Sequence, residues 1–356
     1  MGGVATLLTP VLLSLLADLR VESRILIGTA FALAAAALGG LWLAETFAAI
    51  FVIHLIFALV LAPLPSLQDG LTFNLQQLRT ARGQQIWPYH RIRVFGSIGF
   101  MAPPLGIYWL LNIGHPVRIA MVAGVMCAVF GFLNATKLPR LLDNGSLARP
   151  PRAHEVDGPK RLPTLSAART ILESHMAVFC IAMFILHLAI SAYYTFYPIY
   201  LTRQLGIDAK WIGLIMSIGV AIEIFFILAW ESLVRRLGLR GLMVLGVTCT
   251  AVRFALLYFV PTTGMAIGTQ VLHGVMVLVV HVAPPIYLNH HAGDTYRNSI
   301  QGLYAMAITG PGRIIGTAIA GHIVSWSLPG VFGYAAALCT VATILLYFAF
   351  REPNMG

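Results

Sequence analysis

Three ionisable residues lie at one depth on three consecutive apolar segments of the chain. Glu223 is about twelve residues into a segment that starts at Trp211, which puts it near the bilayer midplane if this segment spans a membrane. Arg253 and His273 reach a similar depth on the next two segments. A charge at that depth costs at least about 2.5 kcal/mol. We therefore predict that the acid and the guanidinium face each other or a water-filled cavity.

This combination of residues suits the coupled movement of a proton and a solute. Glu223 is the predicted proton carrier, because burial and a nearby cation act in opposite directions on a carboxylate as a cavity opens and closes. Arg253 would hold Glu223 in one state and engage an anionic or hydroxyl-bearing substrate in another. His273 would donate or relay hydrogen bonds. The alternative is a static buried ion pair that fixes the helix register.

Three further residues are candidates for the same cavity. Arg313 follows a Gly-Pro-Gly break and could bind an anionic group or pair with a helix end. His281 could relay a proton or be a packed histidine with a hydrogen bond. Among the tyrosines near residue 200, we expect Tyr194 to line the cavity and Tyr200 to belong to an interfacial aromatic belt.

Membrane-spanning helices are needed to position these residues, and the composition predicts them. With 58% hydrophobic and 10% charged residues, the chain has too little polar surface for a water-soluble body of this size. About eleven apolar segments are long enough to form tilted helices. They are residues 3–17, 25–43, 46–66, 94–112, 116–134, 175–201, 211–230, 241–260, 264–288, 300–323 and 330–350. The predicted fold class is an all-α polytopic membrane protein.

The positive charges predict the orientation. If successive segments cross the membrane in alternate directions, most of the 23 Lys and Arg residues lie in connections on the same side. Only Arg118, Arg203 and Lys210 lie in connections on the other side. Since basic connections stay in the cytoplasm, we expect a bacterial inner membrane with the linker and the C-terminus cytoplasmic. The net charge of +10 is explained by these connections and by anionic lipid, so no nucleic acid partner is expected.

Charged residues near the cytoplasmic helix ends are predicted to act in gating. They are Asp18, Arg20, Arg24, Asp69, Arg91, Arg93, Glu231 and Arg235. Asp69 with Arg91 or Arg93 would form an inner gate, and a surface salt bridge is the competing interpretation. Asp18 and Glu231 would dock against the ends of the linked bundles and stabilise the outward-facing state.

The apolar pattern stops over residues 135–173, which predicts a cytoplasmic linker between an N-terminal bundle (1–134) and a C-terminal bundle (174–356). An internal repeat relates the two parts, because Asp18 and Glu231 each precede a short basic turn. The copy with Glu231 lies at the end of the second span after the linker. If the two halves are duplicates, the copy with Asp18 also lies at the end of a second span, and the N-terminal half lacks its first helix.

The turn from Asp18 to Arg24 and residues 89–100, with Asp69 ahead of them, resemble the major facilitator superfamily. They are similar to its lactose-permease-like branch, which includes 3-phenylpropionate transporters and nucleoside/proton symporters. Residues 270–274, His281 and residues 301–304 resemble the same branch. The resemblance implies a two-bundle fold with about eleven transmembrane helices, twelve minus helix 1, and transport by alternating access.

The resemblance also implies roles for individual residues, since lactose permease carries an acid on helix 8, an arginine on helix 9 and a histidine on helix 10. Glu223, Arg253 and His273 match these positions. The chain departs from that pattern at Met276, where the permease has a second carboxylate, and it has no acid on helix 7 to face Arg313. Neither the lactose mechanism nor a sugar substrate is therefore carried over.

The predicted function is secondary active transport, as proton-coupled symport of a small organic solute across the lipid bilayer. We expect no enzyme activity, cofactor or metal site, because the sequence has no metal-type spacing and no serine in a nucleophile turn. The alternative is a truncated or partner-dependent protein that does not transport, since the absent first helix would normally line the cavity.

Overall fold

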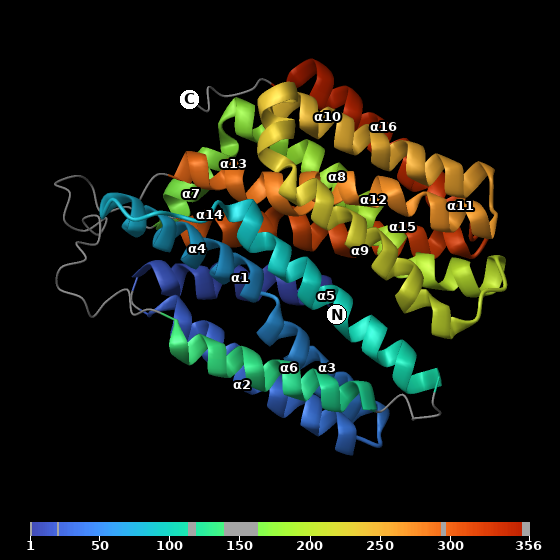
Figure 1. Cartoon of the computed structure of the whole chain (residues 1–356), viewed down its shortest axis with the longest axis horizontal. Coiled ribbons are helices and arrows are strands. Elements are labelled where there is room, and N and C mark those ends of the chain that lie inside the picture. Colours follow the sequence, from blue (N-terminus) through green and yellow to red (C-terminus); the bar gives the residue numbers. More distant parts are fainter. Residues whose placement is uncertain (1, 20, 113–118, 139–162, 293–296, 351–356) are drawn as a thin grey trace. The chain divides into compact units, whose positions relative to one another are not determined.

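The computed structural model describes residues 2–19, 21–112, 119–138, 163–292 and 297–350. Every regular element in these ranges is a helix, which confirms the predicted all-α class (Figure 1). The sequence colouring in Figure 1 runs from the blue helices of the N-terminus to the red helices near the C-terminus.

The helices before residue 174 differ from the prediction in where some of them begin and end. They are α1 (Gly2–Leu19), α2 (Ser23–Leu43), α3 (Phe47–Leu61), α4 (Leu64–Ala81), α5 (Tyr89–Asn112), α6 (Ile119–Lys137) and α7 (Pro163–Leu172). Helix α4 continues well past the predicted end at residue 66, so Asp69 lies within a helix. Helix α5 starts ahead of the predicted residue 94. Helix α7 lies within the predicted linker, most of which falls outside the described residues.

The later part of the chain contains long helices and short turns of wider or tighter helix. The elements are α8 (Ser174–Ile199), η1 (Tyr200–Gln204), η2 (Ala209–Trp211), α9 (Ile212–Leu228), α10 (Trp230–Phe259), α11 (Thr263–Gly268), α12 (Gln270–Val277), η3 (Leu278–Val282), α13 (Ala283–Ala292), α14 (Arg297–Tyr304), η4 (Ala305–Thr309), α15 (Gly310–Val324) and α16 (Gly330–Ala349). The elements η1, η3 and η4 are single π-helical turns, and η2 is a 3₁₀ turn.

Two of the π-turns come just before prolines. Turn η3 precedes Pro284 and Pro285, and turn η4 precedes Pro311. Proline has no amide hydrogen and its ring crowds the preceding turn, so a wider turn accommodates it within a continuous helix. Each π-turn also rotates the side chains that follow it. His281 lies inside η3, and Arg313 comes soon after η4.

Seven helical segments in the described ranges are long and apolar enough to cross a membrane. They are Ser23–Leu43, Phe47–Ala81, Ser174–Gln204, Ala209–Leu228, Trp230–Phe259, Thr263–Ala292 and Gly330–Ala349. Shorter apolar helices cover Ala5–Asp18 and Met121–Lys137. Helices α5 and α15 occupy the remaining predicted spans. A multi-pass chain is thus supported, and the count of eleven spans stays a prediction.

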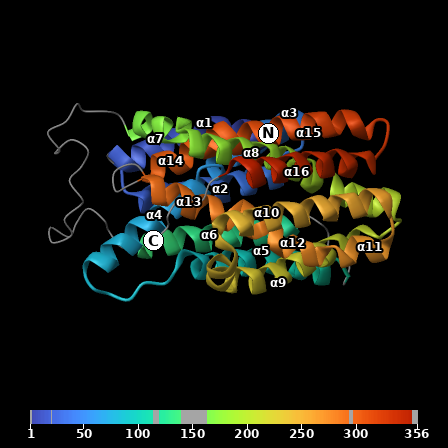
Figure 2. The ribbon, with the colours of Figure 1, turned by 90° about the horizontal axis from the view of Figure 1, so that it is seen from above.

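The contacts group the chain into two compact units. The first consists of Met1–Trp87, Val117–Glu173 and Tyr287–Gly310, and the second of Pro88–Pro116, Ser174–Ile286 and Pro311–Gly356. In the first unit α2 packs along α6, and α1 packs against α14. In the second unit α16 packs between α10 and α8 (Figures 1 and 2). Both units combine segments from both halves of the sequence, and the division into bundles at residues 134 and 174 stays a prediction.

Candidate functional site

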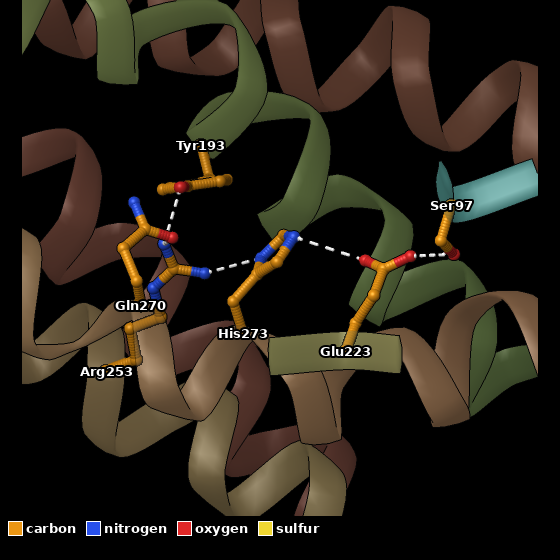
Figure 3. A network of polar contacts seen from close by, with 6 residues as sticks. All are labelled: Ser97, Tyr193, Glu223, Arg253, Gln270 and His273. Carbon is orange, nitrogen blue, oxygen red and sulfur yellow. Dashed lines mark hydrogen bonds and ion pairs between the residues drawn. The ribbon is translucent and has the colours of Figure 1, made fainter. Parts of the chain in front are cut away.

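A row of polar side chains runs through the second unit (Figure 3). The row contains Ser97 of α5, Tyr193 of α8, Glu223 of α9, Arg253 of α10, and Gln270 and His273 of α12. All six side chains are buried. The three residues that the sequence placed at one depth are therefore brought together by the fold.

Arg253 is fully buried and is held only by neutral groups. Its Nη1 lies 2.7 Å from Nδ1 of His273, and its Nη2 donates to the hydroxyl of Tyr193 at 2.5 Å and to Oε1 of Gln270 at 2.9 Å. The guanidinium also lies over the ring of Tyr193, with its Cζ 4.4 Å from the ring centroid. These three acceptors and the aromatic face offset part of the cost of burying the charge.

The contact with Arg253 determines which nitrogen of His273 carries the ring proton. A guanidinium is always a donor, so Nδ1 must accept and the proton must sit on Nε2. Nε2 faces Oε2 of Glu223 at 3.8 Å. The imidazole therefore presents an acceptor to the cation and a donor to the acid.

Glu223 is held from the other side by Ser97, whose hydroxyl donates to Oε1 of the carboxylate. Both neighbours of Glu223 are thus donors, as an ionised carboxylate requires. Glu223 and Arg253 form no direct ion pair in the structure, because His273 lies between them (Figure 3). The predicted direct contact between acid and guanidinium is replaced by a contact through the imidazole.

Two glycines allow α9 and α12 to approach closely enough for this arrangement. A Cβ atom at Gly274 would lie 2.6 Å from Cδ2 of Phe226 and 3.1 Å from the backbone of Glu223. A Cβ atom at Gly219 would lie 2.5 Å from Oε1 of Gln270 and 2.9 Å from Cδ2 of His273. Three of these distances, 2.6, 2.5 and 2.9 Å, are shorter than the contacts that real Cβ atoms make. The backbone at these positions sets the distance between the acid and the imidazole.

Hydrogen bonds connect this row to α11 through Tyr197. Nε2 of Gln270 donates to the hydroxyl of Tyr197, which donates to the carbonyl of Ala266, each at 2.9 Å. Tyr200 is fully buried and donates to the carbonyl of Leu257 at 3.0 Å. The prediction that Tyr200 belongs to an interfacial aromatic belt is therefore wrong, since its hydroxyl is used inside the protein.

The other candidates for the cavity also lie in the second unit. Tyr194 packs edge-on against His273, with 6.2 Å between the ring centroids. His281 is partly buried in η3, and Arg313 is exposed near the start of α15. Arg93, predicted as a gating residue, lies one turn before Ser97 and is close enough to act electrostatically on Glu223. Whether these residues bind a substrate stays a prediction.

The predicted gating residue Asp18 caps a helix of the first unit. Its Oδ2 accepts from the amide of Ser299 at 2.7 Å and from the hydroxyl of Ser299 at 2.5 Å. Its Oδ1 accepts from Nδ2 of Asn298 at 2.6 Å. A carboxylate at a helix N-terminus satisfies free amides and complements the helix dipole. The end of α1 is thereby joined to the first turn of α14.

Glu231, the matching acid of the internal repeat, has a similar partner in the second unit. Its Oε1 lies 3.8 Å from Nε2 of His90, the second residue of α5. The side chain of Glu231 is 60% exposed, which makes this contact weaker than the cap made by Asp18. In both copies of the repeat the acid thus contacts the first turn of a helix from the other half of the sequence.

The remaining predicted gating residues are placed as follows. Arg24 pairs with Glu22, and Arg235 is exposed. Arg20 lies outside the described residues. Asp69 belongs to the first unit, whereas Arg91 and Arg93 belong to the second, and the inner gate between them stays a prediction.

Within the described ranges, no three His, Cys, Asp or Glu side chains are placed to hold a metal ion. The row of polar residues contains a carboxyl group, an imidazole and a guanidinium, together with the neutral side chains of Ser97, Tyr193 and Gln270. Its groups can bind, release and pass a proton, or bind a polar solute.

Three known proteins that are similar to this chain in sequence or structure are described as transporters. The chain is 24% identical over 347 residues to the putative nucleoside transporter YegT of Escherichia coli, covering 87% of this chain and 74% of that protein. A mutant of the nucleoside transporter NupG superposes with a TM-score of 0.74 at 19% identity, covering 98% of this chain and 89% of NupG. The fucose:proton symporter FucP of Escherichia coli gives a TM-score of 0.69 at 14% identity, over 98% and 89% of the two chains.

The structural similarity establishes the major facilitator fold, and the sequence establishes the family. The model of the family described as MFS_1 like family matches residues 3–348, which is nearly the whole chain. The resemblance noted at the turn after Asp18 and at residues 89–100 is thus confirmed at the level of the family. The chain belongs to the MFS_1-like family of membrane transporters and is not an enzyme.

Proposed function

We propose that the chain is a proton-coupled symporter of a small polar organic solute. The observation that carries this proposal is the contact of Glu223 with two donors, Ser97 and His273, inside a buried row. The row ends at Arg253, a buried cation that donates to neutral acceptors. Helix packing in a membrane rarely requires a buried carboxylate that is separated from a buried cation by one neutral side chain. The similarity to YegT and NupG, which are described as nucleoside transporters, and to FucP, a fucose:proton symporter, supports the same class.

The proton step follows from the donors around Glu223. As a carboxylate, Glu223 accepts from Ser97 and faces the Nε2–H of His273. Once protonated, it must donate its own hydrogen, and Nε2 of His273 cannot accept it while Nδ1 is bonded to Arg253. The hydroxyl of Ser97 can rotate to accept instead. Protonation therefore weakens the attraction between Glu223 and His273 and leaves Ser97 as the partner of the acid.

Alternating access would couple this step to transport. Asp18 at the first turn of α14 and Glu231 at the first turn of α5 would stabilise the outward-facing state, and breaking these contacts would open the cytoplasmic side. In this proposal about eleven helices span a bacterial inner membrane in two bundles, with the linker and the C-terminus in the cytoplasm.

Proteoliposomes test the proposal. The purified protein is reconstituted with a pH-sensitive dye inside the vesicles, and a panel of nucleosides, sugars and small organic acids is added outside. At least one solute should drive proton entry. The variant Glu223→Gln should abolish solute-driven proton entry, whereas Glu45→Gln, which changes an exposed carboxylate after α2, should not. Proton entry that is equal in wild type and Glu223→Gln would overturn the proposal.

A further inference from the structure

Arg313 is a cation without a bonded partner inside the second unit. It lies in a predicted membrane span, four residues into α15, and is exposed. The described structure contains no hydrogen bond and no ion pair that holds its guanidinium. This sets it apart from Arg253, whose guanidinium is fully buried and donates to three neutral acceptors.

The groups around Arg313 are basic or neutral. Arg313 acts electrostatically on His187 and Tyr194 of α8 and on His281 of η3. His281 is also close enough to feel Arg93 and His187. Among the described residues, the charged and titratable groups that act on His281 are Arg93, His187 and Arg313, all of them potential cations.

The position of Arg313 is fixed by close packing of α15 on α8. A Cβ atom at Gly312 would lie 2.7 Å from Cβ of His187, and the hydroxyl of Ser191 donates to the carbonyl of Gly312 at 3.3 Å. Gly316, one turn further on, approaches the backbone of Leu188 equally closely. Small residues spaced by four let two helices touch in a membrane. The backbone of Arg313 therefore cannot shift towards a distant acid without breaking this contact.

Placing a guanidinium without a counter-ion in a membrane span costs free energy. The planar guanidinium can donate two parallel hydrogen bonds to a carboxylate. Arg313 and Glu223 both act electrostatically on Tyr194, which contributes a neutral hydroxyl. The acid needed to balance Arg313 is thus missing from its described surroundings, and a ligand can supply it.

We propose that Arg313, with His281 and His187 beside it, binds a carboxylate of the transported organic solute. This inference rests on the proposed transport function and narrows its substrate class to organic anions. Glu223 remains the proton site, and Arg313 becomes a specificity-determining residue. The carboxylate of the solute supplies the anion that pairs with Arg313.

Ligand-induced thermal stabilisation tests the inference without any proton gradient. The detergent-solubilised full chain is heated with small monocarboxylates and with the matching carboxamides, such as benzoate with benzamide and lactate with lactamide. At least one acid should raise the melting temperature more than its amide does. In Arg313→Gln this difference should disappear, whereas it should persist in Arg203→Gln, which changes an exposed arginine of η1.

Several outcomes would overturn the inference. They are equal stabilisation by acids and amides in wild type, a difference that survives in Arg313→Gln, and stabilisation by chloride alone to the same extent as by a carboxylate. Arg313→Lys, which keeps the charge but loses the fork, should bind the acid more weakly than wild type and guards against a folding defect in the glutamine variant. Since Glu223→Gln should still bind the acid, failure of proton coupling and failure of this inference are distinguishable.

Discussion

Nη1 of Arg253 lies 2.7 Å from Nδ1 of His273, so the guanidinium donates and the imidazole accepts. This contact fixes His273 as the neutral tautomer with its proton on Nε2. It also separates the cation from Glu223, which lies on the far side of the imidazole at 3.8 Å. The acid can therefore change its charge without a direct ion pair having to break.

The tautomer of His273 can be observed directly. In protein labelled with ¹⁵N-histidine, the nitrogen signals of His273 should be those of a neutral ring with a hydrogen on Nε2 at neutral pH. The signals are assigned by their loss in His273→Gln. Arg253→Met should remove the constraint and allow both tautomers. A doubly protonated ring, or a hydrogen on Nδ1 in the wild type, would rule out the proposed geometry.

Ser97 should be needed for the proton step because it is the group that can both donate to and accept from Glu223. A hydrogen bond to a charged group contributes about 1.5 to 3 kcal/mol. Ser97→Ala should therefore lower solute-driven proton entry by on the order of tenfold or more. Ser97→Thr keeps the hydroxyl and serves as the matched control. Equal rates for the alanine variant and wild type would remove Ser97 from the mechanism.

Close packing of α9 on α12 should be sensitive to one methyl group at Gly274. Gly274→Ala places a Cβ atom against Phe226 and the backbone of Glu223, and overpacking of this kind costs about 1 to 3 kcal/mol. We expect a lower melting temperature and loss of solute-driven proton entry.

Gly268→Ala is the control for that variant, because a Cβ atom at Gly268 would meet nothing within 4 Å. Its melting temperature should stay close to that of the wild type. If both alanine variants melt like the wild type, the two helices are not held as closely as the structure shows.

The two acids of the internal repeat should differ in importance. Asp18 accepts three hydrogen bonds at the start of α14, and loss of a helix cap costs about 0.5 to 2 kcal/mol. Glu231 is largely exposed, and its contact with His90 should contribute less than about 1 kcal/mol. Thermal unfolding of Asp18→Ala and Glu231→Ala compares them, with Asp18→Ala expected to be the less stable.

A double-mutant cycle identifies the partner of Asp18. Because the amide of Ser299 remains in Ser299→Ala, only the hydroxyl contact is lost, and the coupling energy with Asp18→Ala should be about 0.5 to 3 kcal/mol. Additive effects of the two substitutions, or a larger loss for Glu231→Ala, would contradict the capping role of Asp18.

Depth in the membrane was the part of the site that the sequence could predict. Counting residues from the helix ends placed Glu223, Arg253 and His273 at one level, and the structure brings them into one row. Depth does not determine the direction in which a side chain points around its helix. The insertion of His273 between the two charges depends on the close approach of α9 and α12, which hydropathy does not report.

Other parts of the site depend on backbone features without a simple sequence signal. Turn η3 contains His281, and turn η4 precedes Arg313. A π-turn changes the direction of the side chains within and after it, so the directions of these two residues could not be read from a regular helical period. The prolines after these turns were the available signal. Ser97 was missed because a serine near Gly96 looks like a helix-packing residue until α5 is placed beside α9.

The central claim is that Glu223 takes up and releases the proton. Infrared difference spectroscopy of the reconstituted protein between high and low pH measures this most directly, because a protonated buried carboxyl has its own C=O band. The account predicts a band that appears on acidification, shifts in Ser97→Ala and is absent from Glu223→Gln. A carboxyl band that is identical in wild type and Glu223→Gln would contradict it.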